Sequence, residues 1–165
     1  MSAQEWMFGI VAVIGSLGAL RVVTSSNVMH AALYLVVTLA SVGAAYILLA
    51  AEFLAWVQVL IYVGAIVVLL LFALMLTKAP IGRDTLDNQQ RGLAAVVGIG
   101  ILLGLTILLR GPFGDKRIPK GVTRASDIGS SLFHSYVIPF EVVSVLLLAA
   151  LVGAVVLSRK EEAPE

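Results

Sequence analysis

A glutamine and a tyrosine interrupt the most apolar stretch of the sequence. Gln58 and Tyr62 are four residues apart, so on a helix they share one face. At 1.5 Å per residue, Tyr62 lies roughly 14 Å into a span that begins near residue 53, close to the bilayer midplane. Its hydroxyl needs a hydrogen-bond partner or a water molecule at that depth. The two side chains are therefore candidates for part of a proton path.

Gly64 follows this pair by two residues in the same apolar run. A glycine in a helix interior weakens the local hydrogen-bond ladder, and beside a polar pair it indicates a π-bulge or a hinge. The alternative is that Gly64 only makes room for a neighbouring helix. The residues alone leave both interpretations open.

Two carboxylates lie near the ends of other apolar runs. Glu141 is about a turn into the last run, after Pro139, a residue that suits the first turn of a helix. Glu141 either acts as a cap, favoured by the helix dipole, or serves in a proton relay or salt bridge. Glu52 lies between two apolar runs, where we expect it to reach water and to mark a turn.

Most other chemistry is excluded by residue content. The chain has no cysteine for a disulfide, a thiolate zinc site or an iron–sulfur cluster. His30 and His134 would lie on opposite membrane faces, so they cannot share one haem. Gly98, Gly100 and Gly104 miss the spacing of a dinucleotide-binding motif. We expect no catalytic, metal-binding or cofactor-binding residue in this chain, and its net charge of +1, without a basic run, argues against nucleic acid as a partner.

The elements that position these residues are membrane helices. Hydrophobic residues make up 60% of the chain and charged residues 13%, against about 25% charged residues in ordinary soluble domains. The mean hydropathy is +1.04. The apolar runs reach the roughly 20 residues that cross a bilayer, and only helices satisfy the backbone over such runs. We therefore predict an all-α integral membrane protein with five transmembrane helices in a single membrane domain.

The expected spans are residues 6–24, 31–50, 53–77, 92–109 and 137–157, with loops at 78–91 and 110–136 and a polar tail at 158–165. Only Ala51 and Glu52 separate the second and third spans, which predicts a tight helical hairpin. Six basic residues on one side of the membrane against five on the other favour an outer N-terminus and a cytoplasmic C-terminus.

Small residues repeat at a spacing of four on the last two spans. Gly100 and Gly104 form one such pair, and Ala149 and Gly153 form another. Because helices in lipid associate by close backbone packing, these faces are candidates for helix contacts. The contacts would be made within this chain or with a partner subunit.

Three stretches of sequence carry a family resemblance. The run from Ala51 to Leu71 holds a glutamine, a tyrosine and a Gly-Ala pair at fixed spacing, and the runs Leu132–Leu148 and Asn27–Leu39 add to it. In these features the chain resembles subunit J of bacterial proton-pumping NADH:quinone oxidoreductase. Subunit six of mitochondrial complex I and homologues in plastids are related to that subunit. The resemblance covers nearly the whole chain.

By this resemblance the protein is a non-redox membrane-arm subunit of a translocating enzyme complex. Its third helix would switch between α-helical and π-bulged forms, with Tyr62 and Gly64 at the bulge, and would couple quinone reduction to proton transfer. The partners would be antiporter-like and quinone-site subunits in a bacterial plasma membrane. NADH, FMN, the iron–sulfur clusters and quinone would be bound by those and other subunits, not by this chain.

Two residues depart from the family pattern. Gln58 stands where some relatives have glutamate and cannot ionise, so a water-ordering role is expected there. Val28 replaces the proline of the Asn-Pro-Val-His sequence found in many relatives. The electron donor is left open between NADH and ferredoxin. The alternative functions are a small independent transporter or channel and a purely structural membrane subunit.

Overall fold

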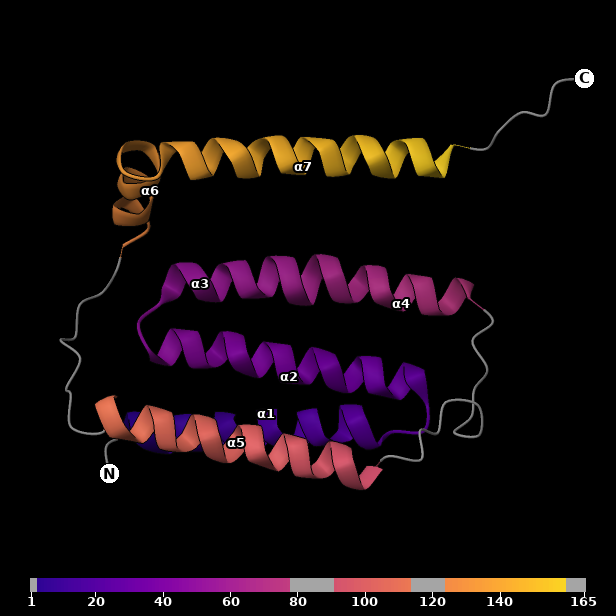
Figure 1. The fold of residues 1–165 in the computed structure, drawn as a ribbon, viewed down its shortest axis with the longest axis vertical. Helices are drawn as coiled ribbons and strands as arrows, with labels where there is room; N and C mark the ends of the chain where they lie inside the picture. The colour runs from indigo at the N-terminus through magenta and orange to yellow at the C-terminus, as the bar shows by residue number, and fades with distance from the viewer. Residues whose placement is uncertain (1–2, 78–90, 114–123, 160–165) are drawn as a thin grey trace, which may run out of the picture. The chain divides into compact units, whose positions relative to one another are not determined.

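The computed structural model describes residues 3–77, 91–113 and 124–159, and within these ranges it contains helices and turns but no strand (Figure 1). The helices are α1 (Ala3–Thr24), α2 (Val28–Leu48), α3 (Glu52–Val57), η1 (Gln58–Ile66), α4 (Val67–Leu76), α5 (Arg91–Phe113), α6 (Ala125–His134) and α7 (Val137–Ser158). Helices α3, η1 and α4 follow one another without a break. The predicted all-α class is confirmed.

Five stretches in the described part of the chain are long and apolar enough to cross a bilayer. They are Ala3–Thr24, Val28–Leu48, Glu52–Leu76, Gly92–Gly111 and Val137–Ser158. Each overlaps one predicted span, and the first two begin three residues earlier than expected. The predicted loop at 78–91, except Arg91, and the predicted tail beyond Arg159 lie outside the described residues.

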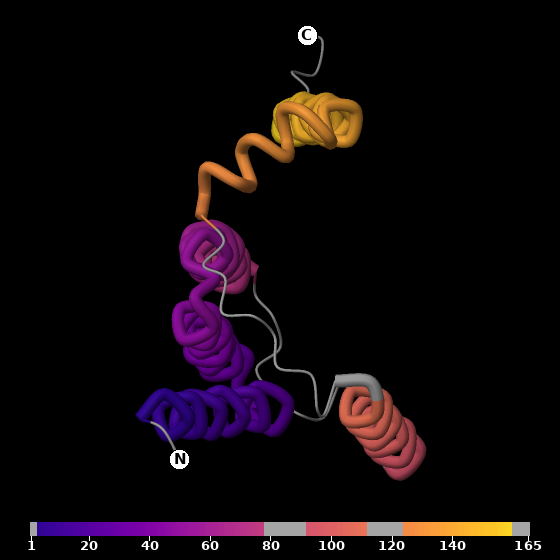
Figure 2. The backbone as a smooth tube through the Cα atoms, turned by 90° about the vertical axis from the view of Figure 1, so that its left-hand side faces the viewer, coloured from indigo at the N-terminus to yellow at the C-terminus, as the bar shows by residue number. Residues whose placement is uncertain are grey.

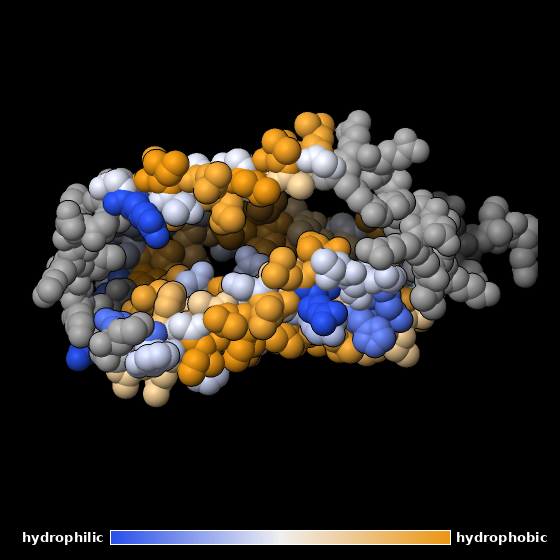
Figure 3. Space-filling model, turned by 90° about the horizontal axis from the view of Figure 1, so that it is seen from below, coloured by the Kyte–Doolittle hydropathy of each residue, from blue (hydrophilic) through white to orange (hydrophobic). Residues whose placement is uncertain are grey.

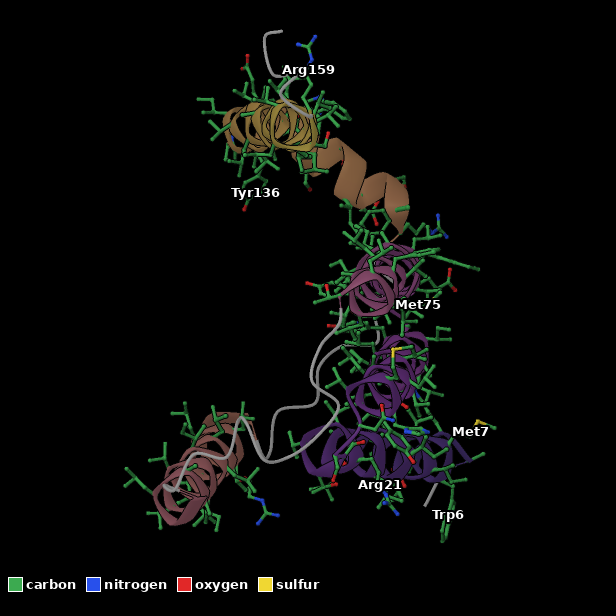
Figure 4. All side chains as sticks on the ribbon, turned by 90° about the vertical axis from the view of Figure 1, so that its right-hand side faces the viewer. Trp6, Met7, Arg21, Met75, Tyr136 and Arg159 are labelled. Carbon is green, nitrogen blue, oxygen red and sulfur yellow. The ribbon has the colours of Figure 1, made fainter. Side chains whose placement is uncertain are left out.

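Helices α1, α2 and the continuous α3–η1–α4 span pack in sequence order (Figure 2). The Gln4 side-chain amide donates to the carbonyl of Leu48, which joins the start of α1 to the end of α2. On the outer face of α1, Trp6 and Arg21 point away from α2 (Figure 4). This row of helices positions the polar residues of the third span.

Almost all apolar side chains of the described residues are exposed. At most 11% of the residues in any spanning window are buried. The face drawn in Figure 3 shows apolar side chains along the middle of the helices and strongly hydrophilic ones near helix ends. Such surfaces are stable only when lipid or other protein covers them. The chain is therefore built to lie in a membrane.

The α1–α2 connection uses a side-chain cap. Asn27 Oδ1 accepts the backbone N–H of Met29 at 2.9 Å and that of His30 at 3.4 Å. Asparagine is one of the preferred N-cap residues because it satisfies these otherwise unpaired donors. The cap forms with Val28 at the first helical position, so the entry to α2 does not need proline there.

The α2–α3 hairpin is as tight as predicted, with three residues between the helices. Ala51 N–H donates to Tyr46 C=O at 2.9 Å and Ala50 N–H donates to Ile47 C=O at 3.0 Å. This is the Schellman arrangement of a helix C-terminus. Ala50 has a φ of 59°, a left-handed conformation that glycine adopts without steric cost. Glu52 is exposed as the first residue of α3, where the helix dipole favours its charge.

Replacing Ala50 by glycine is expected to stabilise the protein by about 0.5–1 kcal/mol. The left-handed conformation costs alanine roughly 1–2 kcal/mol, and the greater freedom of glycine in the unfolded chain offsets part of the gain. Thermal unfolding of the detergent-solubilised protein measures the effect. Ala44→Gly, inside the same helix α2, is the control and should destabilise by about 1 kcal/mol. Equal shifts for both variants would contradict the assignment of strain to Ala50.

A second compact unit comprises residues 123–165 and contains α6 and α7. The predicted loop at 110–136 is wrong in two places, because α5 continues through Phe113 and residues 125–134 form α6. The start of α6 is capped by Asp127, whose Oδ2 accepts the Arg124 N–H at 3.2 Å. Phe133 and Phe140 meet edge to face with ring centroids 5.2 Å apart, which fixes the corner between α6 and α7.

Candidate functional site

The third span changes its helical form in the middle of the membrane. Residues Gln58–Ile66 form a nine-residue π-helix between two α-helical ends. The N–H of Val67 donates to the carbonyl of Tyr62, five residues earlier, whereas an α-helix joins residues four apart. Gly64 lies inside the same segment. π-Helical turns inside α-helices are rare and frequently mark functional sites.

The π-helix sets which side chains face α2. Ala55 is 3% exposed, Gln58 8% and Val67 0%, and the elements that carry them all pack against α2. At about 100° per residue, positions nine apart lie on opposite faces of a straight α-helix, as Gln58 and Val67 would. The wider turns of η1 bring both to the buried side. The packing against α2 therefore favours the π form.

Gln58 lies in a small polar contact between the second and third spans. Its Nε2 donates to the carbonyl of Leu39 at 3.4 Å. Gly43 lies beside this contact: a Cβ built on it would be in ordinary contact with Gln58 Cγ at 3.6 Å and tight against Val59 Cγ2 at 3.3 Å. Neither Leu39 nor Gly43 was predicted as a partner of Gln58. Gly43 could have been noticed in the sequence, because it is a glycine within an apolar helix. Leu39 could not, because every residue has a backbone carbonyl and the sequence does not show which one accepts a hydrogen bond.

Tyr62 lies in a different environment from Gln58. Its side chain is 46% exposed, and none of the described residues forms a hydrogen bond with its hydroxyl. The two side chains were expected to share one helix face. Their surroundings differ, because Gln58 is buried against α2 whereas Tyr62 is half-exposed. The hydroxyl of Tyr62 is open to water, lipid or another subunit.

Gly64 has space around it among the described residues. A Cβ built there would meet a single atom, the carbonyl oxygen of Val59 at 3.4 Å, which belongs to the preceding π turn. No neighbouring helix in the described ranges comes close to Gly64. Within this chain, its surroundings favour a role in the local backbone over a role in helix packing.

Glu141 is exposed in the second turn of α7, four residues after Val137 begins the helix. Pro139 lies in the first turn, as predicted. The helix dipole acts mainly within the first turn, and no side chain makes a capping hydrogen bond at the N-cap Tyr136. The cap-like role of Glu141 is therefore not supported, and the proton-relay role stays a prediction.

The two histidines lie at helix ends. His30 is exposed in the first turn of α2, in line with an interfacial position. His134 was predicted to lie in a loop, but it is the last residue of α6, and its Nδ1 lies 2.9 Å from the carbonyl oxygen of Ser130. In the part of the chain that the structure describes, no group of three His, Asp or Glu side chains is placed to hold a metal ion.

The small-residue faces of the last two spans carry no contact that explains them. A Cβ added at Gly100, Gly104 or Gly153 would meet no described atom within 4 Å. These positions differ from Gly18 of α1, where an added Cβ would lie 2.7 Å from Thr38 Oγ1 on α2. Of these four glycines, only Gly18 is therefore needed for close packing between described helices.

Comparison with known proteins places these features in a family. Residues 18–157 match the family model of NADH-ubiquinone/plastoquinone oxidoreductase chain 6. The chain is 39% identical to F(420)H(2) dehydrogenase subunit J of Methanosarcina mazei, with 94% of this chain and 90% of the relative covered. It is 38% identical to NAD(P)H-quinone oxidoreductase chain 6 of Nostoc sp., with coverage of 98% and 82%. It is 41% identical to NAD(P)H-quinone oxidoreductase chain 6 of Synechocystis sp., with 93% of this chain and 78% of the relative covered.

The matched region contains α2, the α3–η1–α4 span with its π-helix, α5, α6 and most of α7. Family membership also explains the exposed apolar helices, since a subunit of a membrane complex is covered by other subunits and lipid. The chain belongs to the NADH-ubiquinone/plastoquinone oxidoreductase chain 6 family.

Proposed function

We propose that this subunit couples quinone reduction to proton transfer through a change of helical form in its third span. The observation that carries the proposal is the nine-residue π-helix Gln58–Ile66, which lies in the middle of a membrane-spanning helix and contains Tyr62 and Gly64. A π turn holds one more residue per hydrogen-bonded ring than an α turn. Conversion of η1 from a π-helix to an α-helix is therefore a discrete step between two structures.

Conversion of η1 to an α-helix would turn one half of the span against the other. Removing one residue from a turn rotates the following helix by about 100° and shifts it by about 1.5 Å. Gln58 and Val67 could not then both face α2, so one of them would leave its packed position. A neighbouring subunit that contacts the exposed face can bias this equilibrium by preferring one form.

Tyr62 is the group that such a rotation would move between environments. Its half-exposed hydroxyl can donate and accept a hydrogen bond and so order a chain of water molecules. The third span contains no Asp, Glu, Lys or Arg from Phe53 to Thr77, so it cannot store a proton itself. The proton path would be completed by ionisable groups of other subunits, and Glu141 is a candidate contribution from this chain.

The remaining parts of the proposal concern the complex around this chain. Quinone-site and antiporter-like subunits would cover the exposed helix faces, and NADH, FMN and the iron–sulfur clusters would be bound elsewhere in the complex. The absence of cysteine supports the last point, because clusters are held by thiolates. The membrane would be a bacterial plasma membrane, with the N-terminus outside.

Replacing Tyr62 by phenylalanine is expected to lower proton pumping about fivefold, the equivalent of one lost hydrogen bond of about 1 kcal/mol. The hydroxyl is removed while the ring is kept, so assembly should be unaffected. Proton uptake and quinone reduction are measured together in membrane vesicles, with the assembled complex quantified on native gels. Tyr34→Phe on α2 is the control and should pump normally. Normal pumping by the Tyr62 variant would show that its hydroxyl is not part of the proton path.

A further inference from the structure

The short helix α6 has two chemically different faces. Ala125, Ile128, Gly129, Leu132 and Phe133 follow the spacing i, i+3, i+4, i+7 and i+8, which places them along one side of a helix. The opposite side carries only polar residues, at the positions Ser126, Asp127, Ser130, Ser131 and His134. Ile128 and Leu132 are half-buried, but Phe133 is 64% exposed although it contacts Phe140. The apolar face is thus only partly covered by the chain itself.

The direction of α6 relative to α7 is fixed within their compact unit. Helix α6 runs across the axis of α7 at the point where α7 begins (Figures 1 and 2). Two residues separate the helices, and the N–H groups of Ser135 and Tyr136 both donate to the carbonyl of Ser131, at 2.9 and 3.0 Å. The Phe133–Phe140 ring contact braces this corner. Because α7 spans the membrane, a helix that crosses its axis runs along the membrane surface.

We propose that α6 is an interfacial helix that lies in the headgroup region of the bilayer, with Ile128, Leu132 and Phe133 inserted among the acyl chains. Lipid is the proposed partner because α6 ends two residues before a membrane entry point and its exposed ring lies beside that point. Tyr136 projects from the corner and Arg159 follows the other end of α7 (Figure 4). Tyrosine and arginine at the ends of a span are typical interfacial anchors.

The charges of α6 indicate how it is held. Its polar face carries one acidic residue, Asp127, and no Lys or Arg, and the exposed Arg124 at its N-cap offsets that single charge. Binding is therefore expected to rest on the apolar face more than on attraction to anionic headgroups. The covalent link to α7 keeps the apolar face at the interface at high effective concentration. Contact with lipid should therefore persist at high salt and in vesicles of zwitterionic phosphatidylcholine.

Spin labels on single cysteines test this placement. The chain has no native cysteine, so Leu132→Cys, Ile128→Cys and Ser130→Cys each add one label to it, and labels on other subunits are subtracted with the unsubstituted complex. The intact complex is reconstituted in phosphatidylcholine vesicles. Collision rates of each label with oxygen, which concentrates in the bilayer, and with a water-soluble nickel chelate are then compared at low and high salt.

The proposal expects Leu132 and Ile128 labels to collide mainly with oxygen, and the Ser130 label, on the opposite face, to collide mainly with the nickel chelate. The ratio should be unchanged by salt. Equal access of nickel to both faces would mean that α6 is a water-exposed flap and would overturn the proposal. Leu132 and Ile128 labels shielded from both reagents would mean that another subunit covers the face, which would overturn it as well. None of these outcomes depends on whether the third span changes form.

Discussion

Deletion of Val63 is expected to abolish coupled proton translocation while the complex still assembles. Val63 lies inside η1, between Tyr62 and Gly64. In the wild type, the hydrogen bonds of this turn join residues five apart. With one residue fewer, the same turn can form the i to i+4 hydrogen bonds of an α-helix. The deletion should lock the third span in its α form.

The deletion is expected to be compatible with folding. In the full-length span, an α-helix would place Gln58 and Val67 on opposite faces, and the deletion removes this conflict. Without the extra residue, Gln58 and Val67 are eight positions apart, and an α-helix then brings them about 100° closer to the same face. Both can approach α2, which buries them in the present form. The span keeps its packing and loses its second conformation.

Val63→Ala is the matched control, since it trims the same side chain but leaves the number of residues in η1 unchanged. Proton-to-electron ratios are measured in vesicles, and the amount of assembled complex is measured on native gels. Loss of pumping in the deletion but not in Val63→Ala is the expected result. If the deletion variant pumps like the wild type, the π form has no part in coupling, and the third span is a structural element only.

The membrane fold was predictable because its signals are long and independent of partners. Runs of about 20 apolar residues leave the backbone no alternative to a helix in lipid. The tight hairpin followed from the two residues that separate two such runs. The structure adds that this turn needs a left-handed residue at Ala50, which is an uncommon choice of residue and could not be inferred from the apolar pattern.

The form of the third span was not determined by its local sequence. Gly64 is compatible with a π-bulge and with a close helix contact, and the two differ only in what surrounds it. The deciding feature is the burial of both Gln58 and Val67 against α2, which is a tertiary contact. The π-helix is thus a consequence of packing between spans.

Helix α6 was missed for a different reason. Its ten residues include a glycine and four serines or aspartates, which are weak helix formers, and it is too short to register as a span. The regular spacing of Ala125, Ile128, Leu132 and Phe133 was nevertheless present in the sequence. Helical periodicity inside a segment between two spans is the signal that indicates such a helix.

Gly18→Ala is expected to lower the stability of the protein by about 1–3 kcal/mol, the usual cost of overpacking. Gly18 is buried where α1 meets α2, and a Cβ there would lie 2.7 Å from Thr38 Oγ1. The hydroxyl of Thr38 is held in place by donation to the carbonyl of Tyr34 at 2.9 Å. Gly9→Ala on the same helix meets nothing within 4 Å and is the control, expected to be neutral or stabilising.

A second substitution identifies the clash itself. The atoms other than Thr38 Oγ1 near an added Cβ are Thr38 N at 3.4 Å and Tyr34 O at 3.5 Å, distances that a packed methyl group tolerates. Thr38→Ala removes the hydroxyl, and alone it should cost about 1 kcal/mol for the lost hydrogen bond. In the Gly18→Ala, Thr38→Ala double variant the two costs should not add, and thermal unfolding should show a stability close to that of Thr38→Ala alone. Additive costs would mean that the backbones of α1 and α2, not the threonine hydroxyl, limit how closely these helices pack.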